Sequence, residues 1–222
     1  MPAFMFGMMK YGRPVAMAAS LVLAAVCGSP VNAQSGADDL ANCQREESLP
    51  EFKLQSCSNV IADSSQLPEI RADAYLNRGI AQEDLNNLAD AIEDYSQAIK
   101  LNPEHRALYH YRGLAYDRDG KDDLAIADFT EAIRLDPTDT EALLYRGLIY
   151  AARSDFDKAI TDYSTALEHD PENEDALSAR GEAREAKGER DLAIADYRRA
   201  LELDDDNEEA LNGLQRLGVS RK

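Results

Sequence analysis

Small and apolar residues recur along the chain with a period of 34 residues. In each period a glycine is followed by an alanine, an isoleucine, an aromatic residue and a second alanine, and these four stand at helical spacing. The columns are Gly79, Gly113, Gly147, Gly181; Ala91, Ala125, Ala159, Ala193; Ile92, Ile126, Ile160, Ile194; Tyr95, Phe129, Tyr163, Tyr197; and Ala98, Ala132, Ala166, Ala200. A glycine within a helix costs about 1 kcal/mol relative to alanine, so its repetition indicates that two helices approach closely there. The pattern predicts an all-α fold of stacked antiparallel helix pairs.

The units end at prolines and carry two charged columns. Residues before proline avoid the helical conformation, so Asn102-Pro103, Asp136-Pro137 and Asp170-Pro171 should end helices. A basic column stands beside the glycines and an acidic column beside the aromatic residues: Arg78, Arg112, Arg146, Arg180 and Asp94, Asp128, Asp162, Asp196. We predict that each arginine pairs with an aspartate of its own or the adjacent unit, as a structural ladder and not a binding site.

These columns resemble the tetratricopeptide repeat family, in which a helix pair of 34 residues is repeated. The resemblance covers residues 72–217, with three departures: arginine replaces the family's leucine before each glycine, Gln82 and Arg184 stand where its second tyrosine would be, and Asp205 replaces the fourth proline. It implies a right-handed superhelical solenoid of antiparallel helix pairs. Residues 207–217, with Leu211, Leu214 and Leu217 on one face, should form a helix that caps the open end.

The expected organisation has seven parts. They are a signal peptide at 1–33, a degenerate N-terminal helical hairpin at 34–71, four repeats at 72–105, 106–139, 140–173 and 174–207, and a capping helix with its tail at 208–222.

The first segment has the features of a secretory leader. Lys10 and Arg13 precede an apolar run at 15–26, and Val31-Asn32-Ala33 offers the small residues that a signal peptidase reads. We therefore expect cleavage after Ala33 and a periplasmic or secreted protein. A permanent membrane anchor is disfavoured because the run is shorter than the roughly 20 residues that span a bilayer. A lipoprotein acylated at Cys27 is the other alternative, and Val26, which is not small, disfavours it.

Two cysteines remain after such cleavage, Cys43 and Cys57, and each lies seven residues from Pro50. Equal distance from a turn puts them level on an antiparallel hairpin, so we expect a disulfide in an oxidising compartment. Residues 53–61 can be aligned with 91–99, which places Cys57 in the aromatic column of a degenerate first repeat. A redox-active pair would lack the usual Cys-x-x-Cys spacing, and a metal site would lack further ligands nearby.

The chain is strongly acidic, with 24 Lys and Arg against 42 Asp and Glu and a net charge of −18. This charge disfavours nucleic acid and anionic membrane surfaces as partners. The resemblance implies a ligand groove lined by the first helix of each pair, where acidic and apolar residues gather. The predicted partner-binding residues are Leu76, Ile80, Glu83, Asp84, His110, Leu114, Asp117, Glu141, Leu144, Leu148, Glu182 and Glu185.

Such a groove suits a protein or peptide that carries basic residues beside apolar anchors. The alternative is a solvated acidic face with the partner elsewhere. Family members that clamp acidic chaperone tails use basic groove residues, which this groove lacks, so that use is excluded.

Catalysis finds little support in the sequence. The three histidines, His105, His110 and His169, are interpreted as solvated, and neither a phosphate-binding glycine loop nor an HExxH or GxSxG motif occurs. The acidic run at 204–206 lacks the ligand pattern of a calcium loop and is better read as a helix flank. We expect no catalytic residue, cofactor or metal. The predicted function is a non-catalytic protein–protein interaction scaffold of the bacterial envelope; the alternatives are an assembly-factor lipoprotein or a self-associating scaffold, and the oligomeric state stays open.

Overall fold

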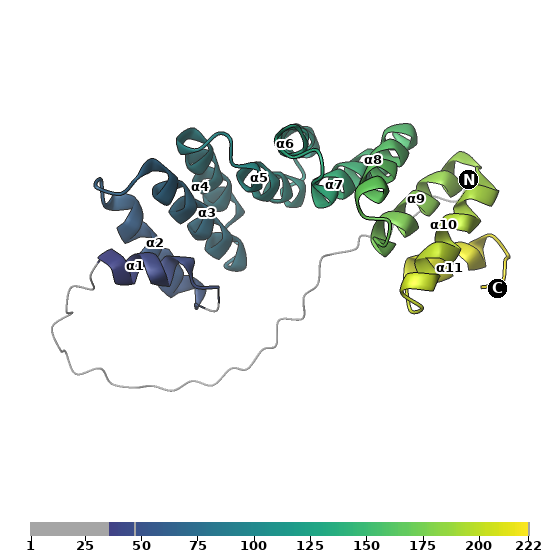
Figure 1. The fold of residues 1–222 in the computed structure, drawn as a ribbon, viewed down its shortest axis with the longest axis horizontal. Helices are drawn as coiled ribbons and strands as arrows, with labels where there is room; N and C mark the ends of the chain where they lie inside the picture. The colour runs from purple at the N-terminus through teal and green to yellow at the C-terminus, as the bar shows by residue number, and fades with distance from the viewer. Residues whose placement is uncertain (1–35, 47, 222) are drawn as a thin grey trace. The chain divides into compact units, whose positions relative to one another are not determined.

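The computed structural model describes residues 36–46 and 48–221, so the predicted leader lies outside the described residues. Regular structure in these ranges is entirely helical, and each helix packs on the next one along the chain (Figure 1). The helices are α1 Gly36–Gln44, α2 Pro50–Ala62, α3 Pro68–Asp84, α4 Leu88–Leu101, α5 Arg106–Arg118, α6 Asp122–Leu135, α7 Thr140–Ala152, α8 Phe156–His169, α9 Glu174–Lys187, α10 Arg190–Leu203 and α11 Glu208–Arg216. The predicted all-α array is confirmed.

The glycine column marks the closest approach within each pair. A Cβ added at Gly79 would lie 2.4 Å from the ring of Tyr95, and one at Gly147 would lie 2.5 Å from the ring of Tyr163. The aromatic rings are fully buried, so they cannot move away cheaply. The glycine therefore exists to admit the ring of the second helix, as the sequence predicts.

The ends of the helices follow the proline pattern. Helices α4, α6 and α8 end directly before Asn102, Asp136 and Asp170, the residues that precede the prolines. Between the two helices of each pair, one residue adopts a left-handed conformation with φ between 62° and 81°; these residues are Asn86, Gly120, Ser154 and Gly188. They share the period of 34 residues, a column that the sequence analysis did not identify because only two of the four are glycine.

The arginine and aspartate columns form a continuous ladder. Arg112 donates two hydrogen bonds to Asp128, at 2.7 and 2.8 Å, and a third to Ser96 of the preceding pair at 3.0 Å. The same arrangement occurs at Arg78–Asp94, Arg146–Asp162 and Arg180–Asp196. Each arginine thus pairs with the aspartate of its own unit and also bonds the unit before it. The predicted ladder is confirmed.

Helices α1 and α2 form a hairpin closed by the predicted disulfide. Cys43 and Cys57 are bonded, with 4.8 Å between their Cα atoms, and both are fully buried. They pack with Val60 of α2 and Ala74 of α3, which joins the hairpin to the first regular pair.

The array ends at α11, as predicted. The side chain of Asn207 accepts a hydrogen bond from the backbone N–H of Ala210 at 2.9 Å and so caps the helix. Leu214 is buried against α9 and α10, and Gly213 lies on the ring of Tyr197. Over the described part of the chain, no helix is long and apolar enough to cross a membrane.

Candidate binding face

The first helices of the four pairs, α3, α5, α7 and α9, contact one another in succession, and α9 also contacts α11. Among the described residues the second helices α4, α6, α8 and α10 make no such contacts with each other. The first helices therefore form one continuous surface, here called the first-helix face. All twelve predicted partner-binding residues lie on these four helices.

The apolar members are partly used by the core. Leu76, Ile80, Leu114 and Leu144 are half-buried and pack against buried side chains of their own and neighbouring pairs. Leu148 is the most open, with 36% of its surface exposed. The apolar stripe therefore stabilises the array and leaves a limited apolar surface for a ligand.

Glu83 is engaged inside the fold. The hydroxyl of Tyr95 donates to one of its oxygens at 2.7 Å, and Arg118 of the next first helix forms an ion pair with the other. Only 14% of the Glu83 side chain is exposed. This carboxylate therefore binds an internal arginine.

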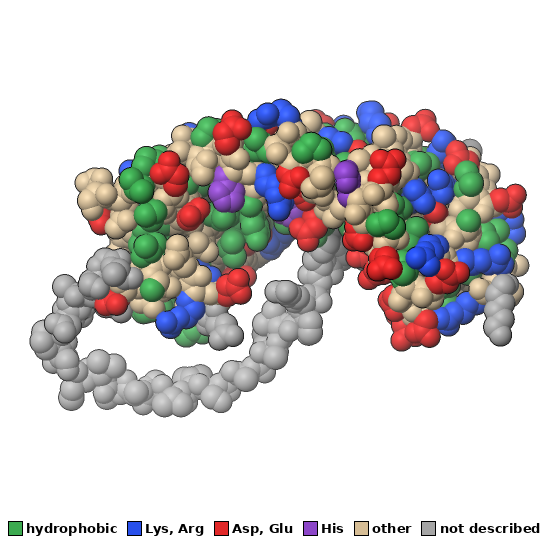
Figure 2. Space-filling view, in the orientation of Figure 1, with side chains coloured by type: hydrophobic (Ala, Val, Ile, Leu, Met, Phe, Trp, Pro, Cys, Tyr) green, Lys and Arg blue, Asp and Glu red, His purple; other side chains and the backbone are tan. Residues whose placement is uncertain are grey.

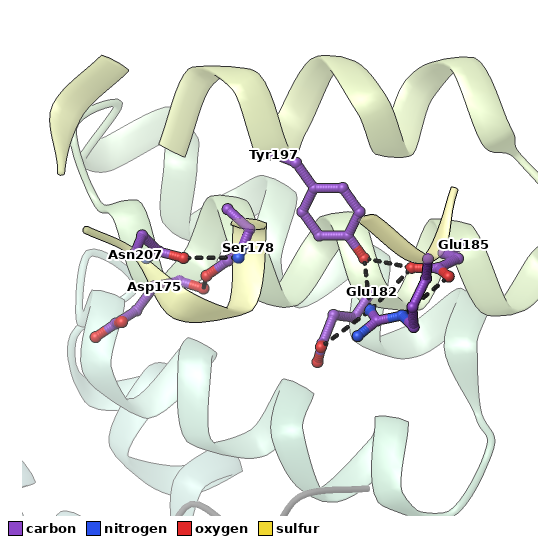
Figure 3. Close-up of polar contacts among 8 residues, drawn as sticks. Asp175, Ser178, Glu182, Glu185, Tyr197 and Asn207 are labelled. Atoms are coloured by element: carbon purple, nitrogen blue, oxygen red, sulfur yellow. Dashed lines mark hydrogen bonds and ion pairs between the residues drawn. The ribbon is translucent and has the colours of Figure 1, made fainter. Parts of the chain in front are cut away.

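A similar arrangement closes the C-terminal end (Figure 3). Tyr197 points toward Glu185 and donates to it at 2.7 Å, and Arg216 of α11 bonds Glu185 at 2.9 Å and approaches Glu182 at 3.5 Å. Burial raises the pKa of Glu182, while Arg216 opposes that rise. Glu182 and Glu185 therefore hold the capping helix in place.

Asp117 occupies the same column as Glu83 and Glu185 but lacks their partners. Its second-helix neighbour is Phe129, which has no hydroxyl, and the position that corresponds to Arg118 is Ala152. Within the described chain its carboxylate has no hydrogen bond or ion pair. Burial, together with the nearby Asp122, raises the pKa of Asp117. This half-buried charge is uncompensated.

His110 corrects the sequence analysis, which interpreted it as solvated. Only 7% of it is exposed, and its ring packs edge-on against Tyr111, Phe129 and Tyr145. Burial lowers the pKa of His110, against the opposing effect of Asp139 and Glu141. A signal for this was present, because His110 stands in the column of Leu76 and Leu144.

His110, Asp139 and Glu141 bring donor atoms within 4.8 Å of one another and could approach a cation. Asp139, however, already caps α7 through the N–H of Ala142 at 3.0 Å and accepts from Arg106 at 2.6 Å. Its oxygens are therefore committed to the fold, and the cluster is better explained as the structured start of α7.

Two shallow pockets lie beside ladder arginines, about 300 Å³ next to Arg146 and about 250 Å³ next to Arg78. The charges that line the first are paired internally: Arg146 with Asp162 at 2.8 Å, and Lys158 with Asp155 at 3.0 Å. These charges are already neutralised within the fold, so the pocket has no evident ligand chemistry.

Comparison with known families identifies the repeat. Tetratricopeptide repeat profiles match residues 76–140, 147–188 and 174–207. The chain belongs to the tetratricopeptide repeat family. No curated protein matches it at a significant level.

Solved structures agree with this tetratricopeptide array. MamA is 24% identical with a TM-score of 0.68, covering 77% of this chain and 92% of MamA. YrrB, described as a TPR protein with an unusual peptide-binding site, is 23% identical with a TM-score of 0.64, covering 75% of this chain and 84% of YrrB. The first TPR of Spaghetti (RPAP3), solved with the HSP90 peptide SRMEEVD, is 31% identical with a TM-score of 0.50, covering 51% of this chain and 90% of that one. The first two similarities show the fold alone.

Charge is spread widely over the tetratricopeptide array. Figure 2 shows acidic side chains among basic and hydrophobic ones over the whole visible face, without a single acidic patch. The useful distinction is therefore between carboxylates with an internal cation and those without. On the first-helix face Asp84 and Asp117 have no such partner among the described residues, and Glu141 has only His110, at 3.7 Å.

Proposed function

We propose that this tetratricopeptide array is a non-catalytic interaction scaffold of the bacterial envelope that binds a basic, partly apolar segment of a partner protein on its first-helix face. The observation that carries the proposal is the set of carboxylates left without an internal cation, Asp84, Asp117 and Glu141, beside the exposed Leu148. Opposite charge favours association and gives it specificity.

Two structural relatives support peptide binding in general. YrrB is described as having a peptide-binding site, and the Spaghetti domain was solved with the peptide SRMEEVD. The end of that peptide is acidic, whereas the free charges on this face are acidic too. Like charges repel, so the proposed ligand has the opposite sign.

Export is part of the proposal. A buried disulfide between Cys43 and Cys57 suits an oxidising compartment. Together with the leader-like sequence it supports a periplasmic or secreted protein that is cleaved after Ala33. N-terminal sequencing or intact mass of the exported protein should place its start at Gln34. A start at an acylated Cys27, or retention of residues 1–33, would overturn this assignment.

Charge reversal on the face tests the function. Asp84, Asp117 and Glu141 should be changed together to lysine; Glu83 and Glu185 are left intact because they hold internal arginines. Partners captured from envelope extract by the wild type should be lost, and their binding should weaken as salt rises. Exposed charge changes usually alter stability by under about 0.5 kcal/mol, so helicity should remain.

The matched control reverses three exposed carboxylates of second helices, Glu93, Glu168 and Asp191. This variant has the same net charge as the first and should keep the partners. If both variants lose them equally, net charge is responsible and the first-helix face is not the binding surface.

A further inference from the structure

The 83-column of the first helices contains three carboxylates, Glu83, Asp117 and Glu185, and one alanine, Ala151. In the first and fourth pairs an arginine from the next helix neutralises the carboxylate, namely Arg118 on Glu83 and Arg216 on Glu185. Figure 3 shows this arrangement in the fourth pair, with Tyr197 pointing at the same carboxylate. The fold itself thus shows twice how a guanidinium binds at this column.

The second pair has the carboxylate but not the cation. Arg118 lies 35 residues after Glu83, and the residue 35 positions after Asp117 is Ala152, which is exposed and too short to reach it. Asp117 also lies in the last turn of α5, where the helix dipole is negative, and close to Asp122. All three features make a cation from outside favourable at this point.

The surroundings suit a side chain with an apolar stem. Leu114 stands three residues before Asp117 on the same face of α5, and Leu148 occupies the equivalent position on α7. An arginine can lay its methylene groups on such side chains while its guanidinium bonds a carboxylate in bidentate geometry.

We propose that Asp117 is the anchor for an arginine of the partner segment, which takes the place that Arg118 takes on Glu83. This inference rests on the proposed function, since it names the residue of the partner that the first-helix face recognises. Arginine is expected over lysine because both internal examples use the planar guanidinium.

A display library of random dodecapeptides, selected on the mature disulfide-bonded protein, tests the anchor. Selected peptides should share an arginine at one fixed position beside an apolar residue. A synthetic peptide of that sequence should bind Asp117→Asn about tenfold more weakly than the wild type, the usual effect of losing a charge-assisted hydrogen bond. Replacing its arginine with neutral citrulline should cost the same on the wild type and nothing further on Asp117→Asn.

The chain offers a matched gain-of-arginine pair. Ala152→Arg should place an internal guanidinium on Asp117 and weaken the peptide by a similar factor. Ala186→Arg adds the same charge at the equivalent position of α9, where the column residue is Ala151, and should leave binding unchanged. Ala152→Gln retains the bulk without the charge and should bind like the wild type. Thermal unfolding checks that each variant is folded.

The outcomes separate the two proposals. Peptides selected without a fixed arginine, or equal binding by Asp117→Asn, would overturn the anchor and leave a peptide-binding face. Equal weakening by Ala152→Arg and Ala186→Arg would also overturn it, because the effect would then be general charge. Failure to select any peptide would overturn both the anchor and the proposed function.

Discussion

The N-terminal hairpin and the regular pairs solve the same packing problem with different chemistry. In a regular pair a glycine of the first helix admits an aromatic ring of the second, as Gly79 admits Tyr95. In the hairpin, Cys43 of α1 faces Cys57 of α2, and the two are joined covalently. The hairpin helices bury few large side chains, so a covalent link replaces the area that a ring would bury.

The contact with the next unit is nevertheless retained. Ser58 of α2 accepts a hydrogen bond from Arg78 at 3.0 Å, as Ser96 accepts one from Arg112. The contact inside a unit and the contact between units are therefore separable, and the first can change while the second is kept. We propose on this ground that the hairpin is a degenerate repeat.

The ladder should give the largest effect, because it is the device that both regions share. Arg112→Ala leaves Asp128 buried without its cation and Ser96 without its donor. Removing one member of a buried pair costs about 3–5 kcal/mol, and the partial exposure of Arg112 places this change near the lower end. Urea unfolding measures the loss.

A double variant checks that the loss comes from the stranded charge. Arg112→Leu restores the residue type that the family has at this position, and combining it with Asp128→Ala removes the charge as well. The double variant should be more stable than Arg112→Leu alone. A double variant that is less stable by the sum of the two changes would show that the ladder is not a coupled unit.

The disulfide should come next, with an effect confined to the hairpin. Changing Cys43 and Cys57 together to alanine opens a loop of 14 residues, for which chain entropy predicts a loss of about 3 kcal/mol or less. Hydrogen exchange should accelerate in α1 and α2 while α5 to α10 remain protected, since repeat arrays unfold locally. Equal acceleration throughout the array would contradict the separation drawn above.

Much of this fold could be predicted because its determinants are local and repeated. Glycine, aromatic residue and proline act within one unit, so their columns specified the helix pairs, and the symmetric cysteines specified the disulfide. The left-handed turn was missed at Asn86 and Ser154 because those residues do not resemble glycine in a sequence.

The candidate site was less accessible because its contacts cross between units. Glu83 and Glu185 were predicted to face a ligand, yet each is held by an arginine more than 30 residues away. The sequence shows the spacing of these residues but not how the next helix inclines, so it could not distinguish them from Asp117.

The glycine contact sharpens the comparison by its gradation among the regular pairs. Gly147→Ala would place its Cβ 2.5 Å from the ring of Tyr163, whereas the same change at Gly113 would leave 3.0 Å to Phe129. Overpacking typically costs about 1–3 kcal/mol, and alanine regains about 1 kcal/mol of helix propensity. We expect a net loss of about 1–2 kcal/mol for Gly147→Ala and almost none for Gly113→Ala by thermal unfolding. The reverse order would mean that ring contact does not explain the column.

The smallest expected effect lies at the turns, which the regular pairs build with one left-handed residue each. Ser154 adopts φ 62° where the second and fourth pairs have Gly120 and Gly188. A non-glycine residue pays about 1–2 kcal/mol in this region, and glycine gives part of that back through its greater freedom when unfolded. Ser154→Gly should therefore stabilise the array by about 0.5–1 kcal/mol, measured as a higher midpoint in urea. Asn86→Gly should gain less, because asparagine tolerates the conformation, and Ser154→Ala should gain nothing. A gain for alanine equal to that for glycine would show that the serine side chain, and not the backbone, limits this turn.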